Sequence, residues 1–216
     1  MIQHTLPPLP YGYASLEPWI DADTMRIHHD VHHRLCVDRL NAIEKQLATL
    51  PGHADAMRIE PLERSATRHK SEHSLHCLFW EVMDPNQGGQ PRGELAEQLA
   101  RDFLSFSGFK AQFSAAATAL EGGGWVALAW RPTHHRLVIV DMPGDQPLIS
   151  SDIDNSVLAL DVWRHAYHLK YKKSLTKYVH NWWNTVNWSR VAELFRAVTQ
   201  PHAVLPRVRS ERRSLR

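Results

Sequence analysis

The chain has 216 residues, of which 43% are hydrophobic and 22% charged, so it can bury a core as one compact unit or two small lobes. It contains no apolar run of about eighteen residues, and its first segment, MIQHTLPPLPYGY, lacks the basic and apolar regions of a signal peptide, so a membrane or exported protein is not expected. The only two cysteines, Cys36 and Cys77, do not form the pattern of a disulfide scaffold. We therefore expect a soluble, cytoplasmic protein.

The formal net charge of +2 is unevenly spread along the chain. Residues 199–216 carry five arginines and one glutamate, so this tail is at +4 and the remainder at −2. We expect a basic, disordered tail over 199–216, and no nucleic-acid binding except by attraction of this tail to phosphates. The compositional oddity is the 15 histidines, several of them clustered.

The N-terminal part reads as an extended arm followed by two helices. Prolines in the segment LPPLP exclude a helix there. Asp21 or Asp23 is a candidate N-cap for a helix over about 24–48, which has apolar residues at an imperfect helical period. A second helix over about 61–83 ends at the turn residues DPN. These two helices predict a hairpin.

The C-terminal part mixes helices with short strands. The pattern predicts a helix over 93–119, and the run Gly122–Gly124 then interrupts it. Three apolar runs predict strands at 125–130, 136–141 and 157–163, and helical periodicity returns over 167–198. We predict an α+β fold: an N-terminal α-helical hairpin domain at 1–90, and a C-terminal domain at 91–198 with a three-stranded antiparallel sheet flanked by helices.

Histidine spacing within the predicted helices suggests where chemistry lies. His28 and His32 are four residues apart and share one helix face, whereas His29 and His33 point elsewhere. This spacing by itself is weak, because a histidine on an amphipathic helix is more often a surface or hydrogen-bonded core residue than a metal ligand.

Four segments become specific when they are taken together. They are HTLPPLPYGYASLEPWIDADTMRIHHDVHH from His4, HCLFW from His76 followed by PNQGG, DVWRHAY from Asp161, and WWNTVNW from Trp182. In this order and spacing they resemble the iron/manganese superoxide dismutase family, over His4 to about Val198.

The resemblance implies a metal site and a reaction. The implied ligands are His28, His76, Asp161 and His165, holding one Mn or Fe ion per subunit that converts superoxide to dioxygen and hydrogen peroxide. Three imidazoles and a carboxylate suit either ion, and the same donors also hold zinc, so the sequence does not choose the metal. Trp125 and Trp163 match family aromatics that line the metal pocket.

The resemblance also exposes departures around the implied metal. His32 is the expected gateway residue, and Cys36 stands where the family has a tyrosine. Cys36 is either a redox-active or proton-donating thiol, or a small buried hydrophobe. Glu72 and Val138 occupy the two places from which the family supplies a glutamine to the metal-bound solvent. One alternative is that Glu72 makes the hydrogen bond to the metal-bound solvent. The others are that His73 or an unaligned residue makes it, or that no residue does. The candidate catalytic residues are His32, Cys36 and Glu72.

Two further departures concern the subunit interface. Arg164 replaces a glutamate that reaches across the family's dimer interface, and His168 replaces a tyrosine that pairs with the partner's histidine at the His32 position. We expect a homodimer with an altered interface, with a monomer as the alternative. A cation at Arg164 is unfavourable beside a metal unless the side chain points away.

The expected function is therefore superoxide dismutation with atypical residues around the metal. Two alternatives stay open at this point. One is a related metalloprotein with peroxidase-like or thiol-linked activity centred on Cys36, and the other is a non-catalytic binding role in which the ligands persist for folding stability.

Overall fold

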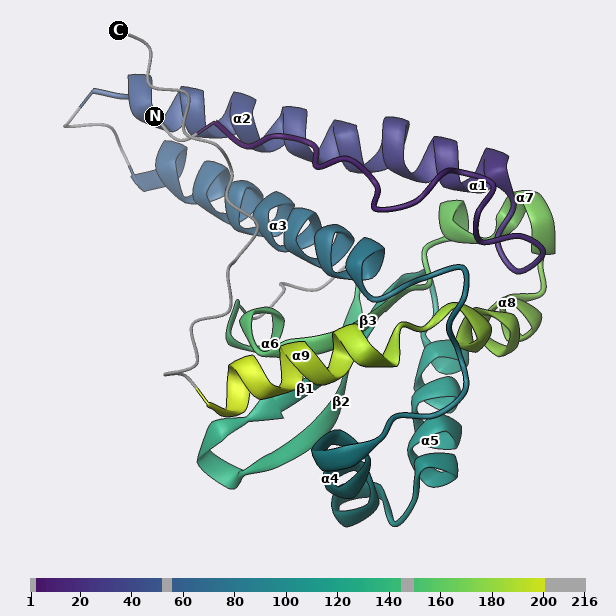
Figure 1. The fold of residues 1–216 in the computed structure, drawn as a ribbon. Helices are drawn as coiled ribbons and strands as arrows, with labels where there is room; N and C mark the ends of the chain where they lie inside the picture. The colour runs from purple at the N-terminus through teal and green to yellow at the C-terminus, as the bar shows by residue number, and fades with distance from the viewer. Residues whose placement is uncertain (1–2, 52–55, 145–149, 201–216) are drawn as a thin grey trace, which may run out of the picture.

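The computed structural model describes residues 3–51, 56–144 and 150–200, and the predicted basic tail lies almost wholly outside the described residues. A long helical hairpin lies along one side of a layer formed by a small sheet and further helices (Figure 1). This is the predicted α+β arrangement, with the hairpin first in the chain.

The first long helix is continuous but changes its winding. It runs as α1 (Ala22–Ile27), a π-helical turn η1 (His28–His33) and α2 (Arg34–Thr49). Asp21 is the N-cap, because its carboxylate accepts a hydrogen bond from the Thr24 backbone N–H at 2.9 Å. The predicted helix is confirmed, and the π-helical turn within it was not foreseen.

The second helix of the hairpin is α3 (Ala56–Glu81), which begins five residues before the predicted start. Pro61 lies inside this helix, near its first turn, rather than at its first position. The helix α2 packs antiparallel against α3, with Val37 and Leu40 of α2 and Leu75 of α3 buried.

The helix predicted over 93–119 is two helices, α4 (Gly93–Phe103) and α5 (Phe106–Ala119). The chain breaks at Leu104, whose φ of 69° is left-handed, and Ser105 then caps α5 by accepting from the Gly108 N–H at 2.9 Å. The prediction of one helix was wrong because the Ser cap and the left-handed residue outweigh the apolar periodicity.

The three predicted strands form one antiparallel sheet with the order β2-β1-β3. They are β1 (Gly124–Arg131), β2 (Arg136–Pro143) and β3 (Ser156–Asp161). A short 3-10 turn, η2 (Pro132–His134), joins the first two, and α6 (Ser150–Asp154) precedes the third. The strand β3 ends at Asp161, two residues before the predicted end.

The helix predicted over 167–198 is also interrupted. The segments after β3 are η3 (Arg164–Ala166), α7 (His168–Tyr171), α8 (Leu175–Trp182), η4 (Trp183–Thr185) and α9 (Trp188–Thr199). Lys172, with φ 56°, ends α7, and the Asn187 side chain caps α9 by accepting from the Arg190 N–H at 3.0 Å.

Backbone hydrogen bonds fasten the end of α3 to the segment before α9. Asp84 N–H donates to the Thr185 carbonyl at 2.7 Å, and Asn187 N–H donates to the Val82 carbonyl at 2.8 Å. This connection helps hold the C-terminal turns of α3 close to the sheet. Among the described residues, no helix is both long enough and apolar enough to cross a membrane.

Candidate metal centre

Four side chains from four separate segments meet beside the end of β3. Asp161 Oδ2 lies 2.9 Å from His28 Nε2, 3.3 Å from His165 Nε2 and 3.9 Å from His76 Nε2. His28 comes from η1, His76 from α3, Asp161 from β3 and His165 from η3. The structure thus brings together all four residues that the resemblance implied as ligands.

Each of these four side chains directs into the cluster an atom that has no hydrogen-bond partner among the described residues. The Nε2 atoms of His28, His76 and His165 and the Oδ2 atom of Asp161 are buried and have no hydrogen-bond partner within the described chain. Asp161 Oδ2 lies at hydrogen-bond distance from His28 Nε2, but the pair lacks hydrogen-bond geometry, and the four ligand atoms all lie within 4.8 Å of one another. Buried polar atoms without partners are costly, and a bound cation removes that cost.

The opposite atoms of two of these side chains are held by the backbone. His76 Nδ1 donates to the Glu72 carbonyl at 2.7 Å, and Asp161 Oδ1 accepts from the Trp163 N–H at 2.7 Å. A hydrogen on Nδ1 leaves the lone pair of His76 on Nε2, the atom that faces the cluster. Such contacts orient metal ligands and set their tautomers.

Burial keeps the imidazoles of His28 and His76 neutral. It lowers the pKa of His28 to about 4 and that of His76 to about 3. For Asp161, burial by itself raises the pKa, but the nearby imidazoles of His165 and His28 outweigh it and hold the pKa below its usual range. Neutral nitrogen donors at His28 and His76 and the Asp161 carboxylate are therefore ready to bind, and together with His165 this set fits a divalent or trivalent first-row metal, zinc included.

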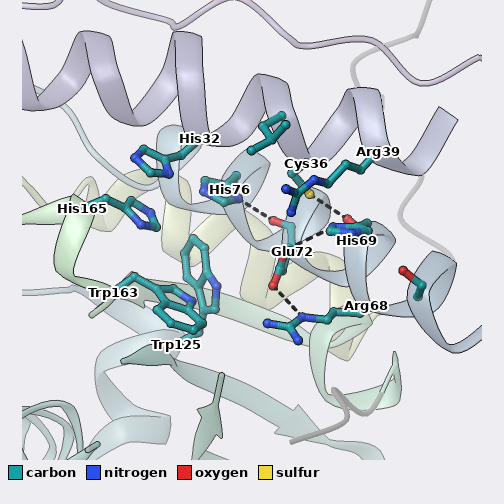
Figure 2. Close-up of a pocket in the computed structure, with 12 residues that line it drawn as sticks. His32, Cys36, Arg39, Arg68, His69, Glu72, His76, Trp125, Trp163 and His165 are labelled. Carbon is teal, nitrogen blue, oxygen red and sulfur yellow. Dashed lines mark hydrogen bonds and ion pairs between the residues drawn. The ribbon is translucent and has the colours of Figure 1, made fainter. Parts of the chain in front are cut away.

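A cavity of about 390 Å³ opens beside this cluster (Figure 2). The predicted gateway residue His32 lines it, and its ring stacks on that of His165, with centroids 4.0 Å apart and planes 10° apart. Trp125 and Trp163 lie on the other side of the same space, near His165. The cluster is thus reached from the cavity past aromatic and imidazole rings.

Two glycines make room for the Trp163 side chain. A Cβ atom on Gly144 would lie 2.0 Å from Trp163 Cζ2, and one on Gly123 would lie 2.8 Å from Trp163 Cε3. The glycine run predicted only as an interruption therefore also positions an aromatic wall of the cavity.

The other two candidate catalytic residues lie further along this cavity. Cys36 is 5% exposed, and its thiol donates to the His69 carbonyl at 3.0 Å. Burial and the nearby Glu72 raise the pKa of the Cys36 thiol. Glu72 accepts from Arg68 Nε at 3.1 Å and has its other oxygen 3.4 Å from His69 Nδ1. The Glu72 carboxylate thus faces Arg68 and His69, and its backbone carbonyl contacts the metal cluster through His76.

Sequence reasoning missed several residues around the cavity. Arg39, Arg68 and His69 line it (Figure 2). A signal was present for His69, because positions 69, 72 and 76 follow the i, i+3, i+7 spacing of one helix face. His33 was expected to point away from the cluster, yet its ring stacks on His76 at 4.7 Å and 10°. The π-helical turn changes the angle per residue, which a regular helical wheel does not include.

The residues predicted at the subunit interface lie on the surface. Arg164 is exposed, whereas the ligand cluster is buried, and His168 is half-buried, with its Nδ1 3.2 Å from the Lys172 carbonyl. Val138 lies on β2 opposite Ala129, in the middle of a strand pair. It is not among the residues that line the cavity.

Comparisons with known proteins agree with the geometry of the site. Residues 3–84 match the alpha-hairpin domain of iron/manganese superoxide dismutases, and residues 91–194 match the C-terminal domain. The iron superoxide dismutase of Pyrobaculum aerophilum is 40% identical over 191 residues, which cover 88% of this chain and 90% of the relative. The chain belongs to the iron/manganese superoxide dismutase family.

A second dismutase relative shows a similar degree of identity. The probable iron superoxide dismutase of Bacillus subtilis is 39% identical over 193 residues, which cover 89% of this chain and 68% of that protein. Family membership accounts for the order of the hairpin and the α+β part, and it confirms the resemblance drawn from the four sequence segments.

Proposed function

We propose that the protein is a superoxide dismutase in which His28, His76, Asp161 and His165 hold one iron or manganese ion per subunit. The observation that supports this most strongly is the convergence of four buried, unsatisfied ligand atoms in a member of this family. When bound, the ion supplies one-electron chemistry that oxidises one superoxide to dioxygen and reduces the next to hydrogen peroxide.

The protein side chains bring an anion to this site and shield it from water. Arg39 and Arg68 line the cavity, and although Glu72 partly offsets the charge of Arg68, the positive charge that is left favours the entry of a small anion. The rings of Trp125 and Trp163 limit the space next to His165. His32 stands beside a proposed ligand as the gateway imidazole, and burial lowers its pKa, so it is largely neutral at pH 7.

The roles of Cys36 and Glu72 are proposed in a modified form. The buried thiol of Cys36 donates to a carbonyl, so a thiol-linked reaction has little support. Glu72 orients His76 through its backbone carbonyl, and its carboxylate is engaged by Arg68. Direct contact of either side chain with substrate stays a prediction. Iron is the first ion to test, because both relatives carry iron in their names.

We also propose a homodimer formed through the surface beside His32. Ile27, Val31 and Leu35, spaced four apart on the first helix, are 39%, 54% and 43% exposed. Apolar side chains that form a row on a surface favour association. Arg164 and His168 would then take the places of the family residues at the interface, and the cytoplasmic location stays a prediction.

The decisive experiment measures superoxide decay directly. Protein loaded separately with iron and with manganese, each quantified by elemental analysis, is mixed with superoxide in a stopped-flow or pulse-radiolysis cell. Decay that is much faster than in buffer, and that scales with bound metal, supports the proposal. Decay at the buffer rate in both fully loaded forms would rule out dismutation and leave a binding role.

A further inference from the structure

A second group of metal-binding side chains lies in the cavity, apart from the four proposed ligands. The Cys36 sulfur, a His69 ring nitrogen and a Glu72 carboxylate oxygen all lie within 4.8 Å of one another. Cys36 comes from α2, whereas His69 and Glu72 are three residues apart on one face of α3. Both helices are long and packed together, so the three groups are held on a rigid frame.

One atom of this group is buried and unsatisfied. His69 Nδ1 has no hydrogen-bond partner within the described chain, and the His69 side chain is 13% exposed. Glu72 Oε2 lies 3.4 Å from it, while Arg68 Nε holds the other oxygen at 3.1 Å. An imidazole nitrogen and a carboxylate oxygen therefore lie 3.4 Å apart as a close pair that lacks hydrogen-bond geometry, next to the Cys36 sulfur.

A neighbouring cluster of similar composition has no unsatisfied imidazole nitrogen of this kind. His33, His73 and Cys77 also have ligand atoms within 4.8 Å of one another. Their imidazoles, however, already form a hydrogen-bonded chain, because Trp80 Nε1–H donates to His33 Nδ1 at 3.0 Å and His33 Nε2 lies 2.7 Å from His73 Nδ1. That cluster needs no cation, and it supplies a matched control.

We propose that Cys36, His69 and Glu72 bind a second, divalent transition-metal ion of the zinc type, in addition to the ion of the dismutase site. Thiolate, imidazole and carboxylate are all zinc ligands, and three protein ligands leave a fourth position open to the cavity. On binding, the sulfur–metal bond replaces the S–H bond and the proton leaves to solvent, with no change in oxidation state. The thiol then gives up its 3.0 Å hydrogen bond to the His69 carbonyl. Thiolate and carboxylate supply two negative charges for the 2+ ion, and Glu72 would share its carboxylate between the ion and Arg68.

The second site adjoins the first through a single residue. Glu72 would bind the second ion with its carboxylate, while its backbone carbonyl holds His76 Nδ1 at 2.7 Å. Residues at such positions tune metal ligands. The second ion is therefore placed to influence the orientation of a dismutase ligand without touching it.

Cobalt is a suitable probe, because a cysteine thiolate bound to Co²⁺ gives a charge-transfer absorption that histidine and carboxylate ligands do not give. Holoprotein with a full complement of iron or manganese is titrated with Co²⁺, and retention of the first metal is checked by elemental analysis. We expect one further equivalent to bind and the thiolate band to appear. Neither readout depends on superoxide turnover, so this test is independent of the proposed dismutation.

Variants identify the ligands. Cys36→Ser should abolish the band, Cys77→Ser should retain it, and Glu72→Gln should weaken Co²⁺ binding by about tenfold or more. His69→Ala keeps both thiols and should no longer bind the second equivalent of Co²⁺. It tests the site independently if Cys36→Ser fails to fold. The proposal is overturned if the wild-type holoprotein binds no second equivalent, or if the band survives Cys36→Ser and is lost in Cys77→Ser.

Discussion

At the scale of single residues, the site depends on a carboxylate that is fully buried and still ionised. Asp161 has 0% exposure, and the adjacent imidazoles hold its pKa below the usual range despite burial. A buried charge of this kind is stable only with compensating partners. When metal is present, the Asp161 carboxylate attracts the cation. When metal is absent, the buried charge of Asp161 is stabilised by the neighbouring histidines.

Replacing Asp161 by Asn should remove the anionic donor with little change in shape. We expect the affinity for iron or manganese to fall by at least about tenfold, and superoxide decay to fall with the bound metal. Elemental analysis after dialysis gives the metal content. Asp141→Asn, at an exposed position on β2, is the matched control and should bind metal normally. Full metal binding by Asp161→Asn would contradict its role as a ligand.

A substitution at Gly144 tests whether the Trp163 ring must keep its position beside the cavity. A methyl group in Gly144→Ala would overlap the Trp163 ring, so the indole must move and the cavity beside His165 must change. We expect about 1 to 3 kcal/mol of destabilisation and slower superoxide decay per bound metal. Urea unfolding and stopped-flow decay measure the two effects. In Gly12→Ala the new Cβ would meet only Ser15 Oγ, at 3.3 Å, so wild-type values are expected there.

At the scale of elements, the π-helical turn η1 is the feature that shapes the site. It carries His28, His32 and His33 on one wide turn, and all three contact the metal cluster or a proposed ligand. π-helical turns are rare and are often found at functional sites. The α-helices on either side keep the turn in place, so the start of the first helix matters to the centre as well.

The N-cap of that helix gives a direct stability test. In Asp21→Ala the Thr24 backbone N–H and hydroxyl both lose the acceptor that they have at 2.9 and 2.7 Å. The expected loss is about 1 kcal/mol in the free energy of unfolding. Asp23→Ala is the control, since it removes an exposed ion pair with Arg26. Its loss in the free energy of unfolding should be well below that of Asp21→Ala. Equal losses in the two variants would argue against the cap.

At the scale of the whole molecule, the centre joins segments that are far apart in sequence. The hairpin supplies two of the proposed ligands and the α+β part supplies the other two, so metal binding links the two parts. The same arrangement concentrates buried histidines at one place. The link between the two parts and the concentration of histidines both affect the stability of the complete chain rather than that of any one element.

The metal-free protein should lose stability in mild acid. Burial lowers the pKa of His28 and of His73 to about 4, whereas an unfolded histidine has a pKa of 6.5. Between these values the unfolded chain binds more protons than the folded one, so the free energy of unfolding is highest above pH 6.5 and falls as the pH drops towards 4. Urea unfolding across this range measures the slope. His73→Gln should make the slope shallower, because it removes one of these buried imidazoles.

The proposed dimer makes a prediction about mass in solution. Wild-type protein should sediment as a dimer, and Val31→Glu should shift it to a monomer, because a carboxylate would be buried in an apolar contact. Leu104→Glu is the control, since Leu104 is 91% exposed in the break between α4 and α5 and its replacement should not change the mass. A wild-type monomer at micromolar concentration would contradict the dimer.

Much of this protein could be predicted from the sequence, because local rules govern it. Apolar periodicity located most of the helical and strand segments, capping chemistry narrowed the start of the first helix to Asp21 or Asp23, and four short segments in order identified the family. The breaks at Leu104 and Lys172 were missed because they depend on left-handed backbone conformations that apolar periodicity does not encode. Only the tertiary structure decided that four distant side chains point their lone pairs at one place, that His33 stacks on His76, and that Cys36, His69 and Glu72 meet in the cavity. Those facts depend on how α2, α3 and β3 pack together, and packing joins residues whose separation along the chain carries no local signal.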